Sequence, residues 1–261
     1  MSNTTLNPVL VEYCKRFQPT NLIKPKFETF FTNLDVQTHF EDLPYLAGIE
    51  NCCLRFIQAY LLKEKICIYS DYDTDAVTAT ATMYHGLLDL GFEPKNIEFY
   101  APDRFTEGYG MNTDAAYMLS QKFDLIVSVD CGINSTQEAD IIKKTNCDLI
   151  ITDHHHLHGS VPDCISVVNC RLAQVYADNN ELKKVFETNR QVFRSDIMHK
   201  LQISLPKSKL DKLESWLQST QKDCSEFHNC PQKFLTQSAT GVAVAWFSLV
   251  WLAYCLEFVG I

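Results

Sequence analysis

The sequence predicts an α/β fold: a mainly parallel sheet with helices on both faces, together with a helical insertion. Short apolar runs alternate with helical patterns between residues 65 and 170. These runs are rich in Val and Ile and almost continuously apolar, which is typical of strands buried on both faces. The chain has 261 residues, 46% of them hydrophobic, so it can bury a large core.

Each element of this alternation has its own signal. The predicted strands are the apolar runs at 65–70, 97–102, 124–130, 147–153 and 165–169. The predicted helices between them cover 76–92, 113–122 and 135–145. We expect the first of these helices to end near Gly91 and the second to be capped by Asn112 or Thr113. Because helices connect successive strands, the strands should be parallel.

Further segments flank or interrupt this core, which covers 65–170. Residues 1–64 are predicted to be a helical segment that packs on the core, with a clear helical pattern at 48–64. Residues 171–234 break the alternation and are predicted to be a helical insertion or lid. Residues 235–261 should add a last core helix.

Charge is uneven along the chain. The net charge is −9, so the protein lacks the general basic footprint of a nucleic-acid-binding protein, although acidity does not exclude such a partner. Only the stretch 171–233 leans basic, with 11 Lys and Arg against 8 Asp and Glu. It could follow a nucleic-acid backbone, but a solvated helical lid is the simpler interpretation.

The stretch 239–256 carries no charge over 18 residues, which is the lower limit for a membrane span. No Lys or Arg cluster flanks it, so we expect a buried core helix and no membrane partner. The start of the chain does not resemble a secretory signal, and the eleven cysteines are scattered. A cytoplasmic protein with reduced thiols is therefore expected.

Acidic residues and histidines follow three of the predicted strands. They are Asp71, Asp73 and Asp75, then Asp130, and then the run Asp153–His156. In open parallel sheets, ligands bind beyond the carboxyl ends of the strands. Crowded carboxylates resist ionising together unless a cation lies among them, so this pattern predicts a metal site.

The types of ligand residue narrow the choice of metal ion. Carboxylate and imidazole suit Mn²⁺, Mg²⁺ or Fe²⁺, whereas a structural zinc site more often uses cysteine. Several carboxylates fit a two-metal site for phosphoryl transfer, with ions about 3.5–4 Å apart and a metal-bound water as nucleophile. Cys224, His228 and Cys230 lie close in sequence, but their spacing fits no common zinc pattern, and we expect no second metal site there.

Each piece of this pattern also has a plainer interpretation. The aspartate triplet can be a solvated turn or a helix start. Asp130 can be a turn former or helix cap, and the histidines can form a polar loop. Their combination at one sheet edge favours the metal site.

Three stretches resemble the first three motifs of the DHH phosphoesterase superfamily: "IYSDYDTDAVTATA" (68–81), "VSVDCGIN" (127–134) and "ITDHHH" (151–156). Within it, the chain is most similar to the RecJ-like exonucleases. The matching stretches there are "YAPDRFTEGYGMN" (100–112), "SVVN" (166–169) and "SATGVAVAWF" (238–247). The likeness covers most of 30–170 and 235–258, and the insertion has no match that we can assign.

The resemblance implies a role for each motif residue. Two Mn²⁺ or Mg²⁺ ions would be held by Asp73, Asp75, Asp130 and His154. Asp71 would be an added ligand or a supporting acid. His155 would contact the scissile phosphate, and Asp153 would orient a histidine. Arg104 is a candidate phosphate contact, although a role as a surface or core-stapling arginine fits it equally well.

The implied function is metal-dependent hydrolysis of single-stranded DNA or short oligonucleotides, as a RecJ-like 5′→3′ exonuclease in DNA repair and recombination. Two alternatives stay open. One is a catalytically impaired scaffold or subunit of a replication or repair complex. The other is a phosphoesterase for small molecules or short RNA, although the segment "RFTEGYG" favours the polynucleotide branch.

The chain also departs from the family pattern. Ala76 stands where relatives usually have glycine, and Tyr69 where they often have histidine. A fourth motif with a further aspartate ligand, and a second substrate-binding domain, would fall beyond Ile261. A second chain that supplies this half is therefore an expected partner.

Overall fold

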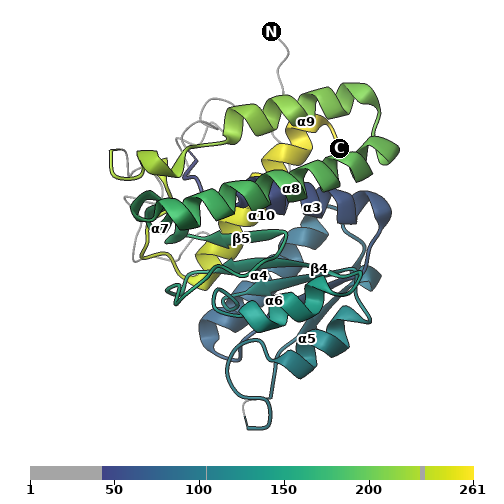
Figure 1. Cartoon of the computed structure of the whole chain (residues 1–261). Helices are drawn as coiled ribbons and strands as arrows, with labels where there is room; N and C mark the ends of the chain where they lie inside the picture. Colours follow the sequence, from purple (N-terminus) through teal and green to yellow (C-terminus); the bar gives the residue numbers. More distant parts are fainter. Residues whose placement is uncertain (1–42, 104, 230–232) are drawn as a thin grey trace, which may run out of the picture. The chain divides into compact units, whose positions relative to one another are not determined.

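Five parallel strands form the central sheet of the computed structural model, in the order β2-β1-β3-β4-β5 (Figure 1). The structure describes residues 43–103, 105–229 and 233–261, and the sheet and its helices belong to the unit Tyr45–Ile261. The strands are β1 (Ile66–Ser70), β2 (Ile97–Tyr100), β3 (Leu125–Val129), β4 (Asp148–Asp153) and β5 (Ser166–Asn169). The predicted α/β class and parallel sheet are confirmed.

The strands are buried as their composition predicts. Every residue of β1, β3 and β5 is buried, because helices cover both faces of the sheet. β2 lies at an edge, where Glu98 and Phe99 are exposed. It ends two residues before its predicted end, since Pro102 has no N–H to give to the ladder.

The helices divide between the two faces. One face carries α3 (Ile49–Leu62), α4 (Thr74–Asp89) and α10 (Gly241–Val259), and the other carries α5 (Thr113–Ser120) and α6 (Thr136–Lys143) (Figure 1). Right-handed crossovers explain this division, because the chain moves in opposite directions along the sheet through α4 and through α5. α4 and α10 approach so closely that a Cβ at Gly86 would lie 2.3 Å from Leu249 Cδ1.

Capping side chains fix the starts of two helices. α4 begins two residues before its predicted start, because Asp73 Oδ1 accepts a hydrogen bond from the Ala76 N–H at 2.9 Å. Asn112 caps α5, and its Oδ1 accepts from the Ala115 N–H at 2.8 Å. Gly91 follows α4 with a φ of 91°, the left-handed conformation expected at a helix stop.

The segment after β5 is helical, as predicted. It forms α7 (Leu172–Asp178), α8 (Asn180–Ser204), α9 (Lys207–Thr220) and a short 3-10 turn, η3 (Cys224–Glu226). α8 packs on α3 and α9 packs on α10, where the buried rings of Trp216 and Trp251 meet edge to face at 6.5 Å. These helices share the core of the unit, and their role as an insertion or lid stays a prediction.

By length and composition alone, α10 could cross a membrane, and it is the only such helix in the part of the chain that the structure describes. In its most apolar window, 61% of the residues are buried. They pack against α3, α4, α9 and β4. This is the packing of a helix in a protein core.

A buried charge network, which we call the Arg55 network, lies at the amino-terminal edge of the sheet. Arg55 on α3 is 1% exposed, and its Nε donates to Asp148 Oδ2 at 2.7 Å. Its other nitrogens donate to Glu64 Oε2 at 2.5 Å and to the Asp124 carbonyl at 3.1 Å. Since Asp124 and Asp148 stand at the starts of β3 and β4, one guanidinium ties α3 to two strands.

Candidate metal site

The candidate site lies where the central strands end. Asp71 follows β1, Asp130 follows β3, and β4 ends at Asp153, directly before His154. After β1 the chain forms β2 on one side of that strand, and it then crosses over to form β3 on the other side. Such a switch point between neighbouring strands is where open α/β sheets bind ligands.

Asp130 occupies a strained position in this crevice. Its φ is 60°, a left-handed conformation that aspartate tolerates better than most residues. Its N–H donates to the Thr152 carbonyl at 2.8 Å, so β4 fixes the turn. The side chain is 2% exposed. Non-glycine residues in such conformations cluster at functional sites.

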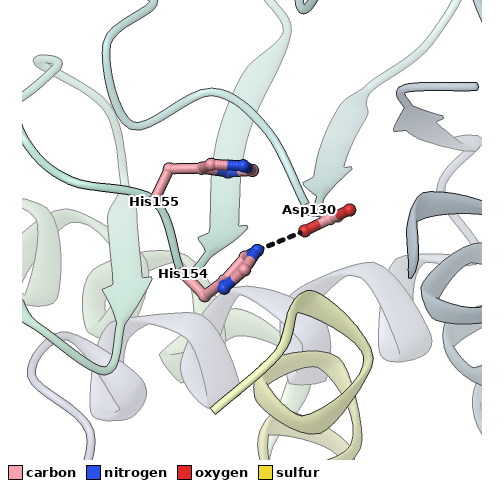
Figure 2. Close-up of side chains that lie close together, drawn as sticks. All are labelled: Asp130, His154 and His155. Carbon is pink, nitrogen blue, oxygen red and sulfur yellow. Dashed lines mark ion pairs between the residues drawn. The ribbon is translucent and has the colours of Figure 1, made fainter. Parts of the chain in front are cut away.

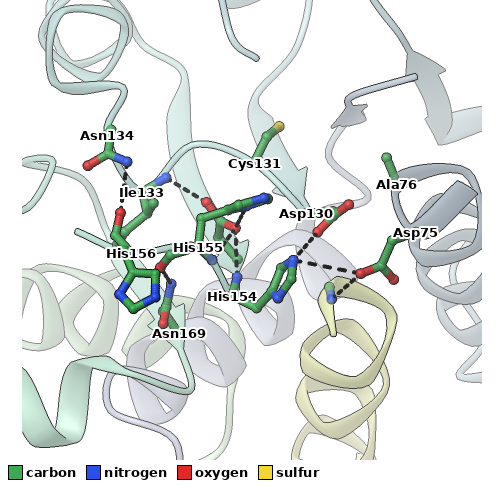
Figure 3. Close-up of polar contacts among 12 residues, drawn as sticks. Asp75, Ala76, Asp130, Cys131, Ile133, Asn134, His154, His155, His156 and Asn169 are labelled. Carbon is green, nitrogen blue, oxygen red and sulfur yellow. Dashed lines mark hydrogen bonds and ion pairs between the residues drawn. The ribbon is translucent and has the colours of Figure 1, made fainter. Parts of the chain in front are cut away.

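Two histidines converge on this aspartate. Ligand atoms of Asp130, His154 and His155 all lie within 4.8 Å of one another (Figure 2). His154 Nε2 lies 3.1 Å from Asp130 Oδ1, although that oxygen accepts no well-aligned hydrogen bond. The contact is therefore electrostatic. The same Nε2 lies 3.7 Å from Asp75 Oδ2 (Figure 3).

The first residues of α10 hold Asp75 in place. The N–H groups of Gly241 and Val242 donate to its two carboxylate oxygens at 2.7 and 3.0 Å. Such N-terminal donors have no partner within their own helix and attract negative charge. A Cβ at Gly241 would lie 2.1 Å from Asp130 Oδ1. Only glycine lets this helix start touch both aspartates.

Among the described residues, all three aspartates of the triplet stand outside the 4.8 Å group, although Asp75 contacts His154. Asp73 caps α4, and Asp71 is 1% exposed after β1. The Ala76 that replaces the usual glycine lies buried in the first turn of α4. It needs no left-handed conformation, because its φ is not positive. The turn therefore accepts alanine.

Asp153 orients His155. Its Oδ1 accepts from the N–H groups of His154 and His155 at 2.6 and 3.1 Å, and it lies 2.7 Å from His155 Nδ1. Its Oδ2 accepts from the Ile133 N–H at 2.9 Å. With Nδ1 directed at this carboxylate, His155 Nε2 faces the Tyr109 hydroxyl at 3.3 Å. The carboxylate thus selects the nitrogen that faces outward.

The electrostatics of Asp130 follow from burial. Desolvation raises its pKa above the ordinary value, and the charges of Asp75 and Asp73 raise it further against the opposing effect of His154. In turn, the close contact with the Asp130 carboxylate raises the pKa of His154. Burial and the neighbouring carboxylates both disfavour the charged form of Asp130, and a cation bound beside it would favour that form.

The pKa of Asp153 is shifted in the opposite direction from that of Asp130. Burial opposes its ionisation, but its hydrogen bonds with His155 and with the Ile133 N–H outweigh burial and lower its pKa. The bond to Asp153 raises the pKa of His155. The negative charge of Asp153 is therefore stabilised by its partners within the chain, whereas that of Asp130 is not.

A cleft of about 650 Å³ opens beside His155. Its walls include Tyr109, Asn134 and the start of α6. Asn134 braces the histidine loop, because its side chain donates to the His156 carbonyl at 3.0 Å and accepts from the His158 N–H at 2.7 Å. The cleft is large enough for an extended ligand next to the cluster.

Some predicted residues fall elsewhere. Arg104 and Cys230 lie outside the described residues. Cys224 is buried, and His228 pairs with Asp178 at 2.7 Å. The hydroxyl of Tyr69, which replaces the family histidine, donates to the Gly110 carbonyl at 2.9 Å.

The chain belongs to the DHH family, because the profile of the DHH family, N-terminal domain, matches residues 65–203. This segment contains all five strands and the residues of the 4.8 Å group. It also extends through α7 and most of α8, into the stretch for which the sequence alone offered no match.

Two relatives carry the same name. The chain is 41% identical over 131 residues to the single-stranded-DNA-specific exonuclease RecJ of Bacillus subtilis, and the alignment covers 50% of this chain and 16% of that protein. It is 33% identical over 130 residues to RecJ of Haemophilus influenzae, covering 49% and 22%. The alignments thus span less than a quarter of either relative.

Two solved structures of RecJ are similar to about half of this chain. An exonuclease RecJ bound to manganese is 30% identical, with a TM-score of 0.46 over 50% of this chain and 33% of that one. RecJ of Thermus thermophilus in complex with Mn²⁺ is 26% identical, with a TM-score of 0.43 over 51% and 18%.

Proposed function

We propose that this chain carries the metal site of a phosphodiesterase that degrades single-stranded DNA, as a RecJ-like 5′→3′ exonuclease in DNA repair and recombination. The observation that carries the proposal is the convergence of Asp130, His154 and His155 at the carboxyl edge of the sheet. Membership of the DHH family and the activity named for the relatives support this substrate.

The donor set suits Mn²⁺ or Mg²⁺. Hard carboxylate oxygens and imidazole nitrogens are ligands for such ions, and Asp130 is a buried carboxylate close to the carboxylates of Asp75 and Asp73. We assign two ions to Asp73, Asp75, Asp130 and His154, with the buried Asp71 as an added ligand or a supporting acid. When bound, such ions lower the pKa of a coordinated water to near neutrality and stabilise charge on the phosphate.

His155 is assigned to the scissile phosphate. Asp153 holds Nδ1, so Nε2 faces the cleft beside Tyr109. The raised pKa of His155 favours the protonated ring, which donates a charge-assisted hydrogen bond to a phosphate oxygen. Arg104 remains a candidate for a second phosphate contact.

We propose that the remaining contacts with the substrate come from protein outside this sequence. Since the alignments span less than a quarter of each relative, we propose that a second domain, on the same or another chain, supplies further strand contacts. We also propose a cytoplasmic location, in keeping with the nine described cysteines, which are all free thiols.

The test is release of nucleotides from 5′-labelled single-stranded DNA in Mn²⁺. Asp130→Asn removes a charged ligand and should reduce the rate about 100-fold or more. Asp163→Asn is the matched control, since it breaks only a surface ion pair with Lys143. Blocking the 5′ end should protect the strand. Equal release by both variants would exclude this site, and undiminished release from the blocked strand would exclude the assigned direction.

A further inference from the structure

Tyr109 lines the cleft beside His155. Its hydroxyl lies 3.3 Å from His155 Nε2, whereas the other ring nitrogen of this histidine contacts Asp153. Among the described residues, the tyrosine hydroxyl has no other hydrogen-bond partner. Tyr109 is 64% exposed and the side chain of His155 is 40% exposed, so both side chains of this contact are open to a ligand.

The backbone on each side of Tyr109 has an unusual conformation. Gly108 and Gly110 have φ values of 84° and 76°, the left-handed region that favours glycine. A Cβ at either position would meet no described atom within 4 Å. A side chain would therefore fit, and it is the backbone conformation that calls for glycine. Both glycines thus serve the shape of the loop that presents the tyrosine.

This loop is anchored to the rest of the fold on both sides of the tyrosine. After it, the Gly110 carbonyl accepts from the hydroxyl of Tyr69 on β1 at 2.9 Å. Before it, Glu107 accepts from the Tyr100 hydroxyl at 2.7 Å and from the Asn112 side chain at 3.3 Å. Since these partners belong to β1, to β2 and to the cap of α5, three elements hold the loop.

Tyr69 is the buried anchor of the loop. It is 0% exposed, and its ring stacks on Tyr100 with centroids 5.6 Å apart and planes at 28°. Packing against the sheet fixes the ring, and the hydroxyl then fixes the carbonyl of Gly110. Because Gly110 directly follows Tyr109, this bond restrains the backbone next to the tyrosine that faces the cleft.

A phosphate that binds His155 comes within reach of Tyr109. Phosphate oxygens are strong acceptors, and one phosphorus atom carries several of them. Two donor groups 3.3 Å apart can each bond a different oxygen of the same phosphate. A tyrosine hydroxyl keeps its proton at neutral pH, since the ordinary phenol pKa is about 10. It can therefore act as the second donor without adding charge to the site.

We propose that Tyr109 is a phosphate-binding residue of this cleft. Its hydroxyl donates to a non-bridging oxygen of the phosphate that His155 contacts, and Tyr69 is the positioning residue that holds the loop for this contact. This assignment rests on the proposed function, because it concerns the same phosphate. The bond goes to the phosphate, so its contribution should not depend on the base.

The test measures the affinity of the full chain for thymidine 5′-monophosphate by calorimetry in the presence of Mn²⁺. Tyr109→Phe keeps the ring and removes only the hydroxyl, so it should bind the nucleotide at least about tenfold more weakly, with unchanged affinity for Mn²⁺. Tyr117→Phe is the matched control. It removes the hydroxyl of another exposed tyrosine, on α5, that does not line the cleft, and it should bind normally.

Two comparisons separate the hydroxyl from the ring. Tyr109→Leu removes both and should bind no more weakly than Tyr109→Phe. Normal binding by Tyr109→Phe together with weak binding by Tyr109→Leu would mean that the ring stacks on the base, and would overturn the proposal. Deoxyadenosine 5′-monophosphate should show the same loss in Tyr109→Phe as the thymidine nucleotide does. A loss confined to one base would also overturn it.

A double-variant cycle tests the role of Tyr69. Tyr69→Phe keeps the stacked ring but releases the Gly110 carbonyl, so nucleotide binding should weaken severalfold. Because Tyr69 acts through Tyr109, adding this change to Tyr109→Phe should cause no further loss. A general structural effect would weaken binding by the same factor in both backgrounds, and that result would overturn the positioning role.

Failure of this assignment is distinguishable from failure of the proposed function. Unchanged nucleotide affinity in Tyr109→Phe would overturn only the role of Tyr109. A natural protein that binds Mn²⁺ but not the nucleotide would also overturn this role and would leave the metal site standing. A natural protein that does not bind Mn²⁺ would overturn the proposed function, and the role of Tyr109 with it.

Discussion

The two ends of the sheet carry two buried charge clusters that differ in completeness. At the amino-terminal edge, Arg55 has a carboxylate or carbonyl partner for each of three nitrogens. At the carboxyl edge, Asp130 is almost equally buried, but its oxygen faces only a histidine at 3.1 Å, and further carboxylates raise its pKa.

The difference separates a structural cluster from a functional one. The Arg55 network satisfies its charges within the chain, so removing one member should weaken the fold. The Asp130 cluster has an excess of like charge that folding alone does not relieve. Removing one member should leave the fold intact and abolish binding of the cation.

Arg55→Met should give the largest loss of stability. It leaves Glu64 and Asp148 without their cation, and breaking a buried pair in this way costs about 3–5 kcal/mol. These carboxylates are 14% and 25% exposed, so we expect the lower end of that range, measured by urea unfolding. Lys122→Met breaks an exposed pair with Glu98 and should change stability by about 0.5 kcal/mol at most. Equal losses would remove the distinction between the two networks.

Gly241→Ala should damage both stability and the site. The new methyl group would lie 2.1 Å from Asp130 Oδ1, and relieving such overpacking costs about 1–3 kcal/mol. Because the start of α10 must shift, Asp75 loses its two donors and Mn²⁺ affinity should fall. Val242→Ala keeps the backbone donors and is the control. Unfolding and calorimetric titration measure the two effects, and unchanged Mn²⁺ affinity would contradict the role of this helix start.

Asp130→Asn should leave the metal-free protein at least as stable as the natural one near neutral pH, because burial disfavours the charge of Asp130. The natural protein should gain about 2.7 kcal/mol at a Mn²⁺ concentration 100 times the Kd. The variant should lose this gain. Melting curves with Mn²⁺ and with chelator give both numbers. A variant that unfolds as readily as Arg55→Met would show that both clusters are structural.

We expect the smallest effect in the pH dependence of stability. As pH rises, the metal-free fold should lose stability, whereas Mn²⁺ binding should strengthen. The folded pKa of His154 is raised above its ordinary value of 6.5. Its contact with Asp130 therefore stabilises the metal-free fold fully below pH 6.5, and that contribution is lost as pH rises through the raised pKa. A ligand histidine must be neutral, so Mn²⁺ binding should strengthen over the same interval.

Melting temperatures measured from pH 6 to 8, with Mn²⁺ and with chelator, test this expectation. His228→Gln is the control, because that histidine lies in an exposed pair with Asp178. Parallel pH profiles with and without Mn²⁺ would argue against His154 as a ligand.

The strands and the acidic strand ends could be predicted because their signals are local. Continuous apolar runs mark buried strands, and parallel strands bring residues such as Asp130 and His154 to one edge. Asp73 shows the limit of local signals. It caps a helix, with one of its two carboxylate oxygens accepting from the Ala76 N–H, and the sequence pattern alone does not separate this role from metal binding.

The support of the site could not be predicted, because it joins distant parts of the chain. Asp75 and Gly241 are separated by 166 positions, and Arg55 and Asp148 by 93. No local period encodes such pairs. A signal did exist at Gly241, since a glycine directly after the capping Thr240 is a poor helix former and indicates close approach of another group.

The contact between α10 and Asp75 also sets the shortest piece of this chain that is worth expressing. The family match ends at residue 203, and α10 begins only at Gly241. A fragment cut at that boundary would keep every motif aspartate and histidine but lose the helix that anchors one carboxylate and covers a sheet face. Truncations meant to preserve the cation centre should therefore retain the chain through Val259.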